Sequence, residues 1–538
     1  MHIETIPAMV QKTSIPTNQS WMRWLPPMLG LLVYLPTLGY GFVWDDRFAI
    51  VGNSSLRSWS TVPQMLWGKL DPTVAMYRPV TSLVQFLEYQ VFGLHPWGYH
   101  LTSAVLHAVA CALVFRVALA LCADLRCAVL AGALFAVHAV HLEAVAWAST
   151  VGDPLVTCFI LAGFLAYLRY RRQRSVLWLS AVCACLFLGL MTKETALVLP
   201  LLFAAYELIC GDQDSRRLRV NLLPATSLIA IVVIYAVLRG RAYAGFVANE
   251  SKLPFSTLLF TWPSLLVGYL RLLLVPYPLS PFYENDYVLA PSAAFWMPLA
   301  VLAAVGVAIY WVSRRVEGGR LVRFCAVAMV VCIIPVLDLN IFQFREVLHD
   351  RFVYVPSVFF ALLVAWLLLR ATQRLRAAAP VYAAVGALVL IGQACALFVQ
   401  QPCWRSDFTL WSHAVQVAPR NPRASFALAN EYLERGELPR AEQELERIVG
   451  LVHAPKAFFM LAQTRMLQGR FAAAEDPLRQ AIALVPERPA QQLMLAQCLE
   501  QLGRRDEAIA AYRAEAAVES QFKQAAIERL SQLSPAKR

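Results

Sequence analysis

Charged residues are scarce in this chain, and their scarcity excludes an ordinary soluble globular protein. Of the 538 residues, only 15% are charged and 59% are hydrophobic, and the mean hydropathy is +0.54. Soluble domains are typically about one quarter charged. The sequence therefore predicts an all-α fold: a polytopic membrane helix bundle followed by a more polar C-terminal region.

Several chemical signatures are also missing. The 12 cysteines form no CxxC pair, and most lie in apolar runs, as Cys183 and Cys185 do, where cysteine behaves as a small hydrophobe. This pattern argues against a disulfide framework and against a cysteine metal site. No short apolar run with a small-residue cleavage site precedes Leu25, so the first apolar segment is predicted to be a retained signal anchor.

The net charge of +12 does not indicate nucleic acid binding, because the basic residues gather in short loops between apolar segments. With the N-terminus in the cytoplasm, every such cluster falls on the cytoplasmic side. The clusters are Arg169, Arg171, Arg172 and Arg174; Arg216, Arg217 and Arg219; Arg314, Arg315 and Arg320; and Arg370, Arg374 and Arg376.

The apolar segments predict about eleven membrane spans, each bounded to within a few residues. A further segment, 256–276, contains Pro263 and Arg271 and is predicted to be an interfacial or re-entrant helix on the outer, non-cytoplasmic side. The spans are 25–42, 99–121, 127–147, 154–169, 176–191, 195–210, 220–238, 293–313, 321–337, 352–370 and 380–400.

This topology divides the chain into three parts. Residues 1–24 form a cytoplasmic tail, 25–400 a transmembrane domain with a large outer loop at 43–98, and 401–538 a domain on the same side as that loop. The outer side is the periplasm in a bacterium or the lumen in a eukaryote. The short loops and compact size favour a multi-pass protein of a bacterial inner membrane over one of the endoplasmic reticulum.

The C-terminal part contains an internal repeat. Segments beginning at Ala429, Ala462 and Ala496 end in Gly436, Gly469 and Gly503, and these glycines are 33 and 34 residues apart; Ala441, Ala474 and Ala508 follow five residues later. The period matches the tetratricopeptide helix pair, in which alanines let the helices approach and glycine permits the turn. Trp411, Ala414 and Pro419 resemble the end of a preceding half-repeat. Such arrays bind peptides or proteins; the alternative is a structural cap or a dimerisation surface.

Two adjacent carboxylates, Asp45 and Asp46, follow directly on the first span, in Trp44-Asp45-Asp46-Arg47. Charges beside a span are costly if they enter the bilayer, so they are candidates for function. We expect them to be a catalytic acid pair, with a divalent cation near them as an option. The alternative is a pair of solvated charges at a helix end.

Three basic residues on the outer side are candidates for gripping a phosphate: Arg78, Lys193 and Arg351. Lys193 and Glu194 lie at the tip of a predicted hairpin, and Arg351 follows His349 and Asp350. The alternatives are snorkelling of Arg78 to lipid headgroups and local ion pairs of Lys193 with Glu194 or of Asp350 with Arg351.

Polar residues also crowd toward the outer ends of other predicted spans. His138 and His141 share a helical face, but with Glu143 they do not form the HExxH zinc motif. We expect them to line a water-accessible cavity rather than to bind a metal ion. The full predicted set of cavity-lining residues is His138, His141, Glu143, Asp153, Glu194, His349 and Asp350.

Several motifs, in this order and followed by the repeats, resemble the transmembrane-and-TPR protein O-mannosyltransferases and, more broadly, the GT-C superfamily of glycosyltransferases. They are GYGFVWDD, MYRPVTSL, PWGYHLTSAVLHAVACALVF, LFAVHAVHLEAVAWAS, TKETALVLPLL and HDRFVYVPSVFFALL. The resemblance implies a GT-C-like bundle in which Asp45 and Asp46 occupy the catalytic positions. The array of only three clear repeats departs from that family.

The resemblance implies transfer of a sugar from a polyprenyl-phosphate donor to a protein hydroxyl on the outer side, with inversion. Expected partners are the lipid-linked donor, an acceptor protein or peptide held by the repeats, and membrane lipids. Two other hypotheses stay open: the same chemistry on a glycan or lipid acceptor, and a non-enzymatic membrane scaffold. A transporter is disfavoured, because the sequence has no inverted repeats with broken helices.

Overall fold

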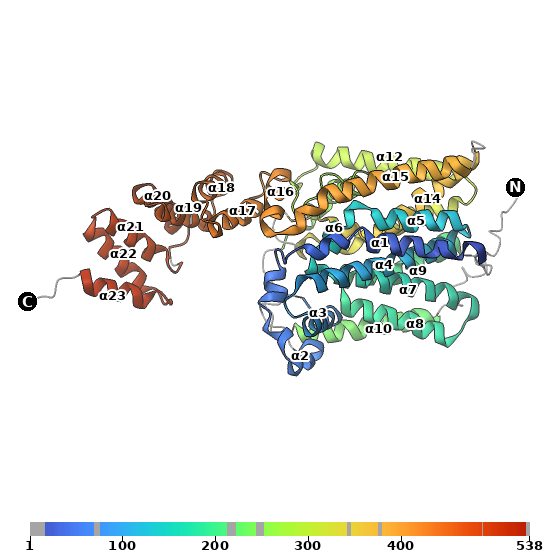
Figure 1. Cartoon of the computed structure of the whole chain (residues 1–538), viewed down its shortest axis with the longest axis horizontal. Coiled ribbons are helices and arrows are strands. Elements are labelled where there is room, and N and C mark those ends of the chain that lie inside the picture. The colour runs from blue at the N-terminus through green and yellow to red at the C-terminus, as the bar shows by residue number, and fades with distance from the viewer. Residues whose placement is uncertain are drawn as a thin grey trace, which may run out of the picture. The chain divides into compact units, whose positions relative to one another are not determined.

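The computed structural model describes residues 17–68, 76–211, 222–243, 252–341, 346–374, 379–486 and 488–533. These residues contain no β-strand, so the predicted all-α class is confirmed. The chain divides into two compact units, Met1–Ser406 and Asp407–Arg538 (Figure 1). The division lies six residues beyond the boundary expected at 400/401. Each unit is described by itself.

The first unit is a bundle of apolar helices. Two short helices, α2 (Val62–Trp67) and α3 (Pro79–Phe92), belong to the predicted outer loop 43–98. The helices of the bundle are α1 (Leu25–Leu32), α4 (Pro96–Cys122), α5 (Leu125–Val137), α6 (Leu142–Ala146), α7 (Gly152–Gln173), α8 (Val176–Thr192), α9 (Val198–Cys210), α10 (Leu222–Ala242), α11 (Phe255–Leu274), α12 (Ala293–Arg315), α13 (Gly319–Ile333), α14 (Pro356–Arg374) and α15 (Ala379–Gln400).

Fewer helices are long enough to span a membrane than the eleven predicted. Among the described residues, eight qualify by length and hydropathy, or nine if a pair bent by 51° counts as one span. The α-helices in predicted spans 25–42, 176–191 and 195–210 are too short: α1, α8 and α9 have 8, 17 and 13 residues. Conversely, α11 qualifies as a span despite Pro263, although we expected that segment to be interfacial or re-entrant.

The predicted span 127–147 is broken at His138, where α5 ends. The imidazole Nδ1 of His138 accepts a hydrogen bond from the backbone N–H of Val140 and so caps the following 3₁₀ turn, Ala139–His141. Side-chain caps of this kind compete with continuation of a helix. The prediction for His141 and Glu143 assumed one straight helix. Because the helix breaks at His138, these two residues do not follow its helical register.

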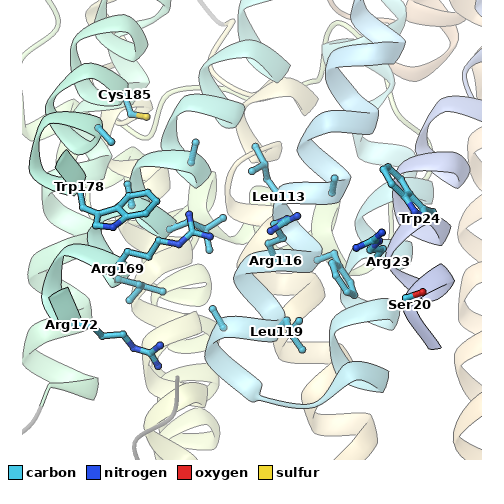
Figure 2. Close-up of a pocket in the computed structure, with 18 residues that line it drawn as sticks. Ser20, Arg23, Trp24, Leu113, Arg116, Leu119, Arg169, Arg172, Trp178 and Cys185 are labelled. Carbon is cyan, nitrogen blue, oxygen red and sulfur yellow. The ribbon is translucent and has the colours of Figure 1, made fainter. Parts of the chain in front are cut away.

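One end of the bundle collects the basic clusters. Arg171 at the end of α7 pairs with Glu207 near the end of α9 at 2.6 Å. Arg374 donates to the carbonyl oxygen of Arg315, and Tyr382 donates to that of Arg126 at 3.4 Å. This basic end also contains a cavity lined by several arginines (Figure 2). Arg216, Arg217, Arg219 and Arg376 lie outside the described residues.

The opposite end carries Asp45, and the chain also leaves the bundle there. The backbone N–H of Gly41 donates to the carbonyl oxygen of Arg405 at 3.1 Å, and the Gln401 amide donates to that of Val33 at 3.0 Å. The last residues of the first unit are therefore held at the end of the bundle that bears the acid pair. Which face of the membrane this end occupies stays a prediction.

The second unit consists of paired helices with the predicted repeat. The pairs are α17 (Pro422–Glu434) with α18 (Leu438–Leu451), α19 (Pro455–Leu467) with α20 (Phe471–Leu484), and α21 (Gln491–Gln501) with α22 (Arg505–Ala517), flanked by α16 (Asp407–Val417) and α23 (Lys523–Leu533). Gly436, Gly469 and Gly503 turn between paired helices with φ of +72°, +74° and +75°. The six repeat alanines are fully buried. The repeat architecture is thereby confirmed.

Candidate active site

The two adjacent aspartates have different environments. Asp45 is exposed, whereas Asp46 is fully buried. One oxygen of Asp46 accepts the Val43 N–H at 3.0 Å, and the other accepts the Ser149 N–H at 2.7 Å and the Ser149 hydroxyl. Asp46 therefore joins the outer loop to the turn before α7, and Asp45 presents its carboxylate at the surface beside it.

Burial raises the pKa of Asp46 to about 7, and the charge of Asp45 adds to the shift, while hydrogen bonds from Ser149 and Val43 oppose it. An aspartate in an unfolded chain titrates near 3.8. The folded state thus retains a proton that the unfolded state has released between about pH 4 and pH 7, so this group makes stability fall as pH rises through that window.

This shift gives a prediction about pH. The thermal midpoint of the wild-type chain should fall between pH 5 and pH 7.5 by more than that of Asp46→Asn, which cannot titrate at this position. Melting curves in detergent at matched ionic strength measure the difference. Asp45→Asn serves as the control and should keep most of the wild-type pH dependence; equal slopes for wild type and Asp46→Asn would contradict the assignment.

Trp44 connects the acid pair to the rest of the site. Its backbone is left-handed, with φ of +53°, and its ring stacks on Trp147 with centroids 4.5 Å apart and planes 5° apart. The Arg351 guanidinium lies 5.3 Å from the centroid of the Trp147 ring. A left-handed backbone is costly for a residue other than glycine, and here the stacked rings hold it. Trp147 is thus shared by the acid loop and by Arg351.

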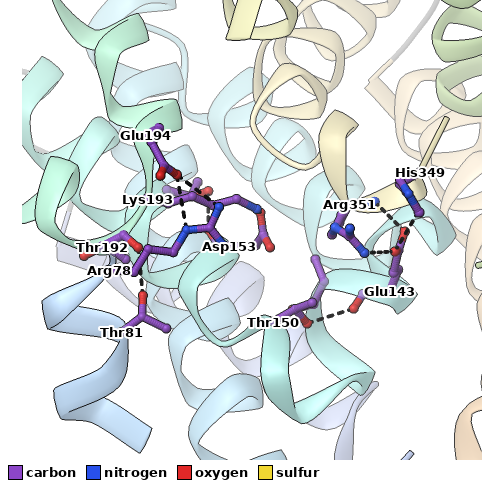
Figure 3. Close-up of polar contacts among 12 residues, drawn as sticks. Arg78, Thr81, Glu143, Thr150, Asp153, Thr192, Lys193, Glu194, His349 and Arg351 are labelled. Carbon is purple, nitrogen blue, oxygen red and sulfur yellow. Dashed lines mark hydrogen bonds and ion pairs between the residues drawn. The ribbon is translucent and has the colours of Figure 1, made fainter. Parts of the chain in front are cut away.

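Arg351 is paired with Glu143 rather than with its neighbour Asp350 (Figure 3). Its guanidinium donates to Oε1 of Glu143, and its backbone N–H donates to Oε2 at 3.0 Å. His349 Nδ1 lies 3.4 Å from the same carboxylate, whose side chain has no exposed surface. Asp350 instead accepts a hydrogen bond from the Tyr283 hydroxyl, and burial raises the pKa of Asp350.

The other two predicted cations are paired over long sequence distances as well. The buried Lys193 ammonium contacts Asp153, not Glu194. Glu194 accepts from Arg78 at 3.0 and 3.2 Å on one oxygen and from Arg239 of α10 at 2.7 Å on the other (Figure 3). The local ion pairs considered as alternatives, Lys193 with Glu194 and Asp350 with Arg351, are therefore wrong.

The three cations converge on one region. Burial lowers the pKa of Lys193; the positive charges of Arg78 and Arg351 lower it further, while Asp153 opposes the shift. Lys193 and Arg351 also lie 5.9 Å and 5.1 Å from the centroid of the same Phe352 ring. The structure thus brings Arg78, Lys193 and Arg351 within electrostatic range, each beside a carboxylate that orients it. We call these three residues the cation cluster.

The two predicted histidines are buried and bonded inside the bundle. His138 Nε2 lies 3.1 Å from the carbonyl oxygen of Leu273, and His141 Nε2 lies 2.7 Å from the Ser357 hydroxyl. Their role in lining a water-filled cavity stays a prediction. Within the described ranges, no group of three or more His, Cys, Asp or Glu side chains is placed to hold a metal ion; a divalent cation beside Asp45 and Asp46 likewise stays a prediction.

Reasoning from the sequence missed four residues of this region: Ser149, Trp147, Arg239 and Tyr283. Ser149 and Trp147 lie at the end of the motif LFAVHAVHLEAVAWAS, so the motif contained them although no pattern gave them a role. Arg239 lies in the last turn of α10, a position that the predicted topology placed at the end of a span. For Tyr283, no signal in the sequence indicated its contact with Asp350.

Comparison with known proteins supports the resemblance. Residues 75–239 match the family model described as dolichyl-phosphate-mannose-protein mannosyltransferase. Residues 440–515 match that described as anaphase-promoting complex, cyclosome, subunit 3. An ArnT crystal structure from Cupriavidus metallidurans, in the apo state, aligns over 86% of this chain and 81% of its own at 17% identity. Its TM-score is 0.43.

Curated relatives give closer matches in sequence. Protein O-mannosyl-transferase Tmtc2 of Drosophila melanogaster is 33% identical over 56% of this chain and 35% of its own length. Protein O-mannosyl-transferase TMTC3 of Mus musculus is 25% identical over 74% of this chain and 48% of its own length. The chain thus spans about a third to a half of these relatives. By motif order, bundle and repeats, it is a relative of the transmembrane-and-TPR protein O-mannosyltransferases, as the sequence motifs indicated.

Proposed function

We propose that the chain is a membrane glycosyltransferase. It transfers a sugar, mannose by analogy with the names of its relatives, from a polyprenyl-phosphate donor to a protein hydroxyl on the outer side of the membrane. The observation that carries this proposal is a chain of contacts: Trp44, which precedes the exposed Asp45, stacks on Trp147, and the Arg351 guanidinium of the cation cluster lies over the same Trp147 ring. A carboxylate base next to phosphate-binding groups is what this reaction requires.

In the proposed mechanism, Asp45 takes the proton of the acceptor hydroxyl as its oxygen forms a bond to the anomeric carbon. The bond from that carbon to the phosphate oxygen breaks on the opposite face, and the polyprenyl phosphate leaves with the electron pair. A guanidinium carries five N–H donors, so Arg78 and Arg351 retain donors for phosphate oxygens while paired with a carboxylate. The cation cluster stabilises the developing negative charge.

Asp46 has a positioning role in this mechanism. Its carboxylate accepts hydrogen bonds from Val43, on the other side of Asp45, and from Ser149 in the turn before α7, and so anchors the loop that carries Asp45. We place this end of the bundle in the periplasm of a bacterium, with the N-terminus in the cytoplasm and the repeats on the periplasmic side. The gathering of arginines at the opposite end supports this orientation.

Reconstitution tests the proposal directly. The purified full chain in proteoliposomes, given polyprenyl-phosphate mannose and a serine- and threonine-rich peptide, should yield mannosylated peptide by mass spectrometry. Liposomes that contain the Asp45→Asn chain are the matched control. No glycosylated peptide with any lipid-linked hexose or pentose, from protein that is folded by melting curve, would contradict the activity.

The repeats give a second prediction, which separates a protein acceptor from a glycan or lipid acceptor. Deleting Asp407–Arg538 should lower transfer to a folded acceptor protein at least tenfold while transfer to a short peptide continues, because the repeats hold the acceptor and the bundle carries the chemistry. Mass spectrometry of the products formed by membranes from a strain with the truncated gene measures transfer to the acceptor protein and transfer to the peptide. Unchanged protein glycosylation would favour the reading in which the repeats recruit other partners.

A further inference from the structure

The cavity at the basic end of the bundle has no part in the proposed chemistry. It measures about 920 Å³ and lies between α4, α7, α8 and the turn that precedes α1 (Figure 2). Because α4 and α7 end here and α1 and α8 begin here, it lies at the far end of these helices from Asp45. A volume of this size is typical of a site for a small molecule or a headgroup.

Four arginines line this cavity without any aspartate or glutamate among the lining residues: Arg23, Arg116, Arg169 and Arg172. The contrast with the other end is clear, because there each member of the cation cluster has a carboxylate beside it. Like charges gathered next to a membrane repel one another unless an anion joins them. Among the described residues, therefore, no carboxylate lines the cavity to neutralise these four arginines.

Two of the arginines are held by tryptophan rings. The Arg169 guanidinium lies 4.6 Å from the centroid of Trp178, and that of Arg23 lies 5.4 Å from the centroid of Trp24. Stacking on a ring uses the face of a guanidinium and leaves its N–H donors at the edge for oxygen acceptors. Tryptophan is also typical of the depth of lipid headgroups. The stacks thus prepare both arginines to bind phosphate at the membrane surface.

Much of the remaining wall of the cavity is apolar. Ala112, Leu113, Ala162, Leu165 and Ala181 line it from three helices. Arg116 lies six residues before the end of the 27-residue α4, about 9 Å from that end at 1.5 Å per residue. Charge at one end and apolar walls toward the membrane interior suit an amphiphile with a negative head and hydrocarbon tails.

We propose that this cavity binds an anionic glycerophospholipid whose headgroup carries two phosphates. In Figure 2, Arg169 and Arg172 lie on one side of the cavity, Arg23 on the other and Arg116 between them. A headgroup with two phosphates, such as that of cardiolipin, offers one anion to each side. Basic pockets between membrane helices on the cytoplasmic side are suited to such headgroups. The proposal does not depend on the proposed transferase activity.

Arginines that merely snorkel to bulk headgroups would give the same exposure without a specific site. The chain contains a control for that case. Arg314 and Arg315 lie at the same end, and Arg315 stacks on Trp311 at 3.7 Å, but neither lines this cavity. A specific site predicts that replacing lining arginines weakens lipid binding and that replacing Arg314 and Arg315 does not.

Native mass spectrometry of the full chain, titrated with cardiolipin, phosphatidylglycerol, phosphatidylethanolamine or undecaprenyl phosphate, tests this site. Each arginine near an anionic headgroup contributes about fivefold, so Arg116→Gln with Arg169→Gln should weaken cardiolipin binding about 25-fold. Arg23→Gln with Arg172→Gln should behave alike, and Arg314→Gln with Arg315→Gln should stay at the wild-type value. Phosphatidylglycerol should bind at least fivefold more weakly than cardiolipin, and phosphatidylethanolamine more weakly still.

The contrary outcomes are distinct. Equal cardiolipin affinity for the lining variants and the control would show bulk headgroup contacts and overturn the site. Undecaprenyl phosphate that binds at least as tightly as cardiolipin, and that the lining variants weaken as they weaken cardiolipin, would assign the cavity to the polyprenyl lipid and overturn the choice of ligand. All four arginines are exposed, so the variants should fold, and melting curves without added lipid verify that before titration.

Discussion

Replacing Asp45 by asparagine should abolish sugar transfer while the protein still folds and binds its donor. A positioned general base typically contributes a factor of about 10² to 10⁴ in rate, and asparagine cannot accept the hydroxyl proton. Because the Asp45 side chain is exposed, the thermal midpoint should change little. Initial rates of peptide mannosylation in proteoliposomes, with binding of labelled donor measured in parallel, give the two readouts.

The matched controls are Asp46→Asn and Ser149→Ala. Both remove parts of the buried hydrogen-bond set that holds the loop, so both should lower the thermal midpoint together with the rate. Asp45→Asn should lower the rate alone. Wild-type transfer by Asp45→Asn would remove this residue from the chemistry, and a loss seen only in Asp46→Asn would transfer the role of base to Asp46.

Arg351→Gln should destabilise the bundle strongly. Removing one partner of a buried ion pair costs about 3–5 kcal/mol, because the other charge is left without compensation. Here the carboxylate left behind would be Glu143, whose side chain has no exposed surface. Arg78→Gln is the comparison, because Arg78 and Glu194 are about one quarter exposed and should lose less. Thermal or denaturant unfolding of the purified chain in one detergent measures both.

The double variant Glu143→Gln with Arg351→Gln separates stability from function. Neutralising both partners removes the buried charge, so the double variant should recover most of the lost stability. The rate of sugar transfer should stay low, because the double variant still lacks the Arg351 guanidinium that binds phosphate in the proposed mechanism. Additive destabilisation in the double variant would show that the two side chains do not act as a pair, and recovery of transfer would remove Arg351 from the phosphate site.

The repeats were predictable because their signal is local. Each glycine lies where the chain must turn with positive φ, and each alanine lies where two helices meet, so a period of 33 to 34 residues recurs in the sequence. The all-α class followed from hydropathy in the same way. The number of spans could not be predicted from hydropathy, because hydropathy does not show that α1 ends after eight residues or that the chain bends at His138.

The ion pairs of the site were beyond prediction for a different reason. Sequence proximity favoured Lys193 with Glu194 and Arg351 with Asp350, but the actual partners of Lys193 and Arg351 are 40 and 208 residues away. Only packing of the helices brings them together. The resemblance to a family indicated the two aspartates, and the fold shows how they differ: Asp45 is exposed and Asp46 is buried.

The hydrogen bond between Gly41 and Arg405 holds the C-terminal end of the bundle against the segment that leads to Asp45. Only Ser406 separates the last turn of the bundle from the first helix of the repeats. Under the proposed function, an acceptor bound to the repeats is held on the same chain as Asp45, and a short connection of this kind typically gives a local concentration in the millimolar range. A low affinity of the repeats for the acceptor would then suffice for transfer, and a low affinity also lets the glycosylated product dissociate quickly.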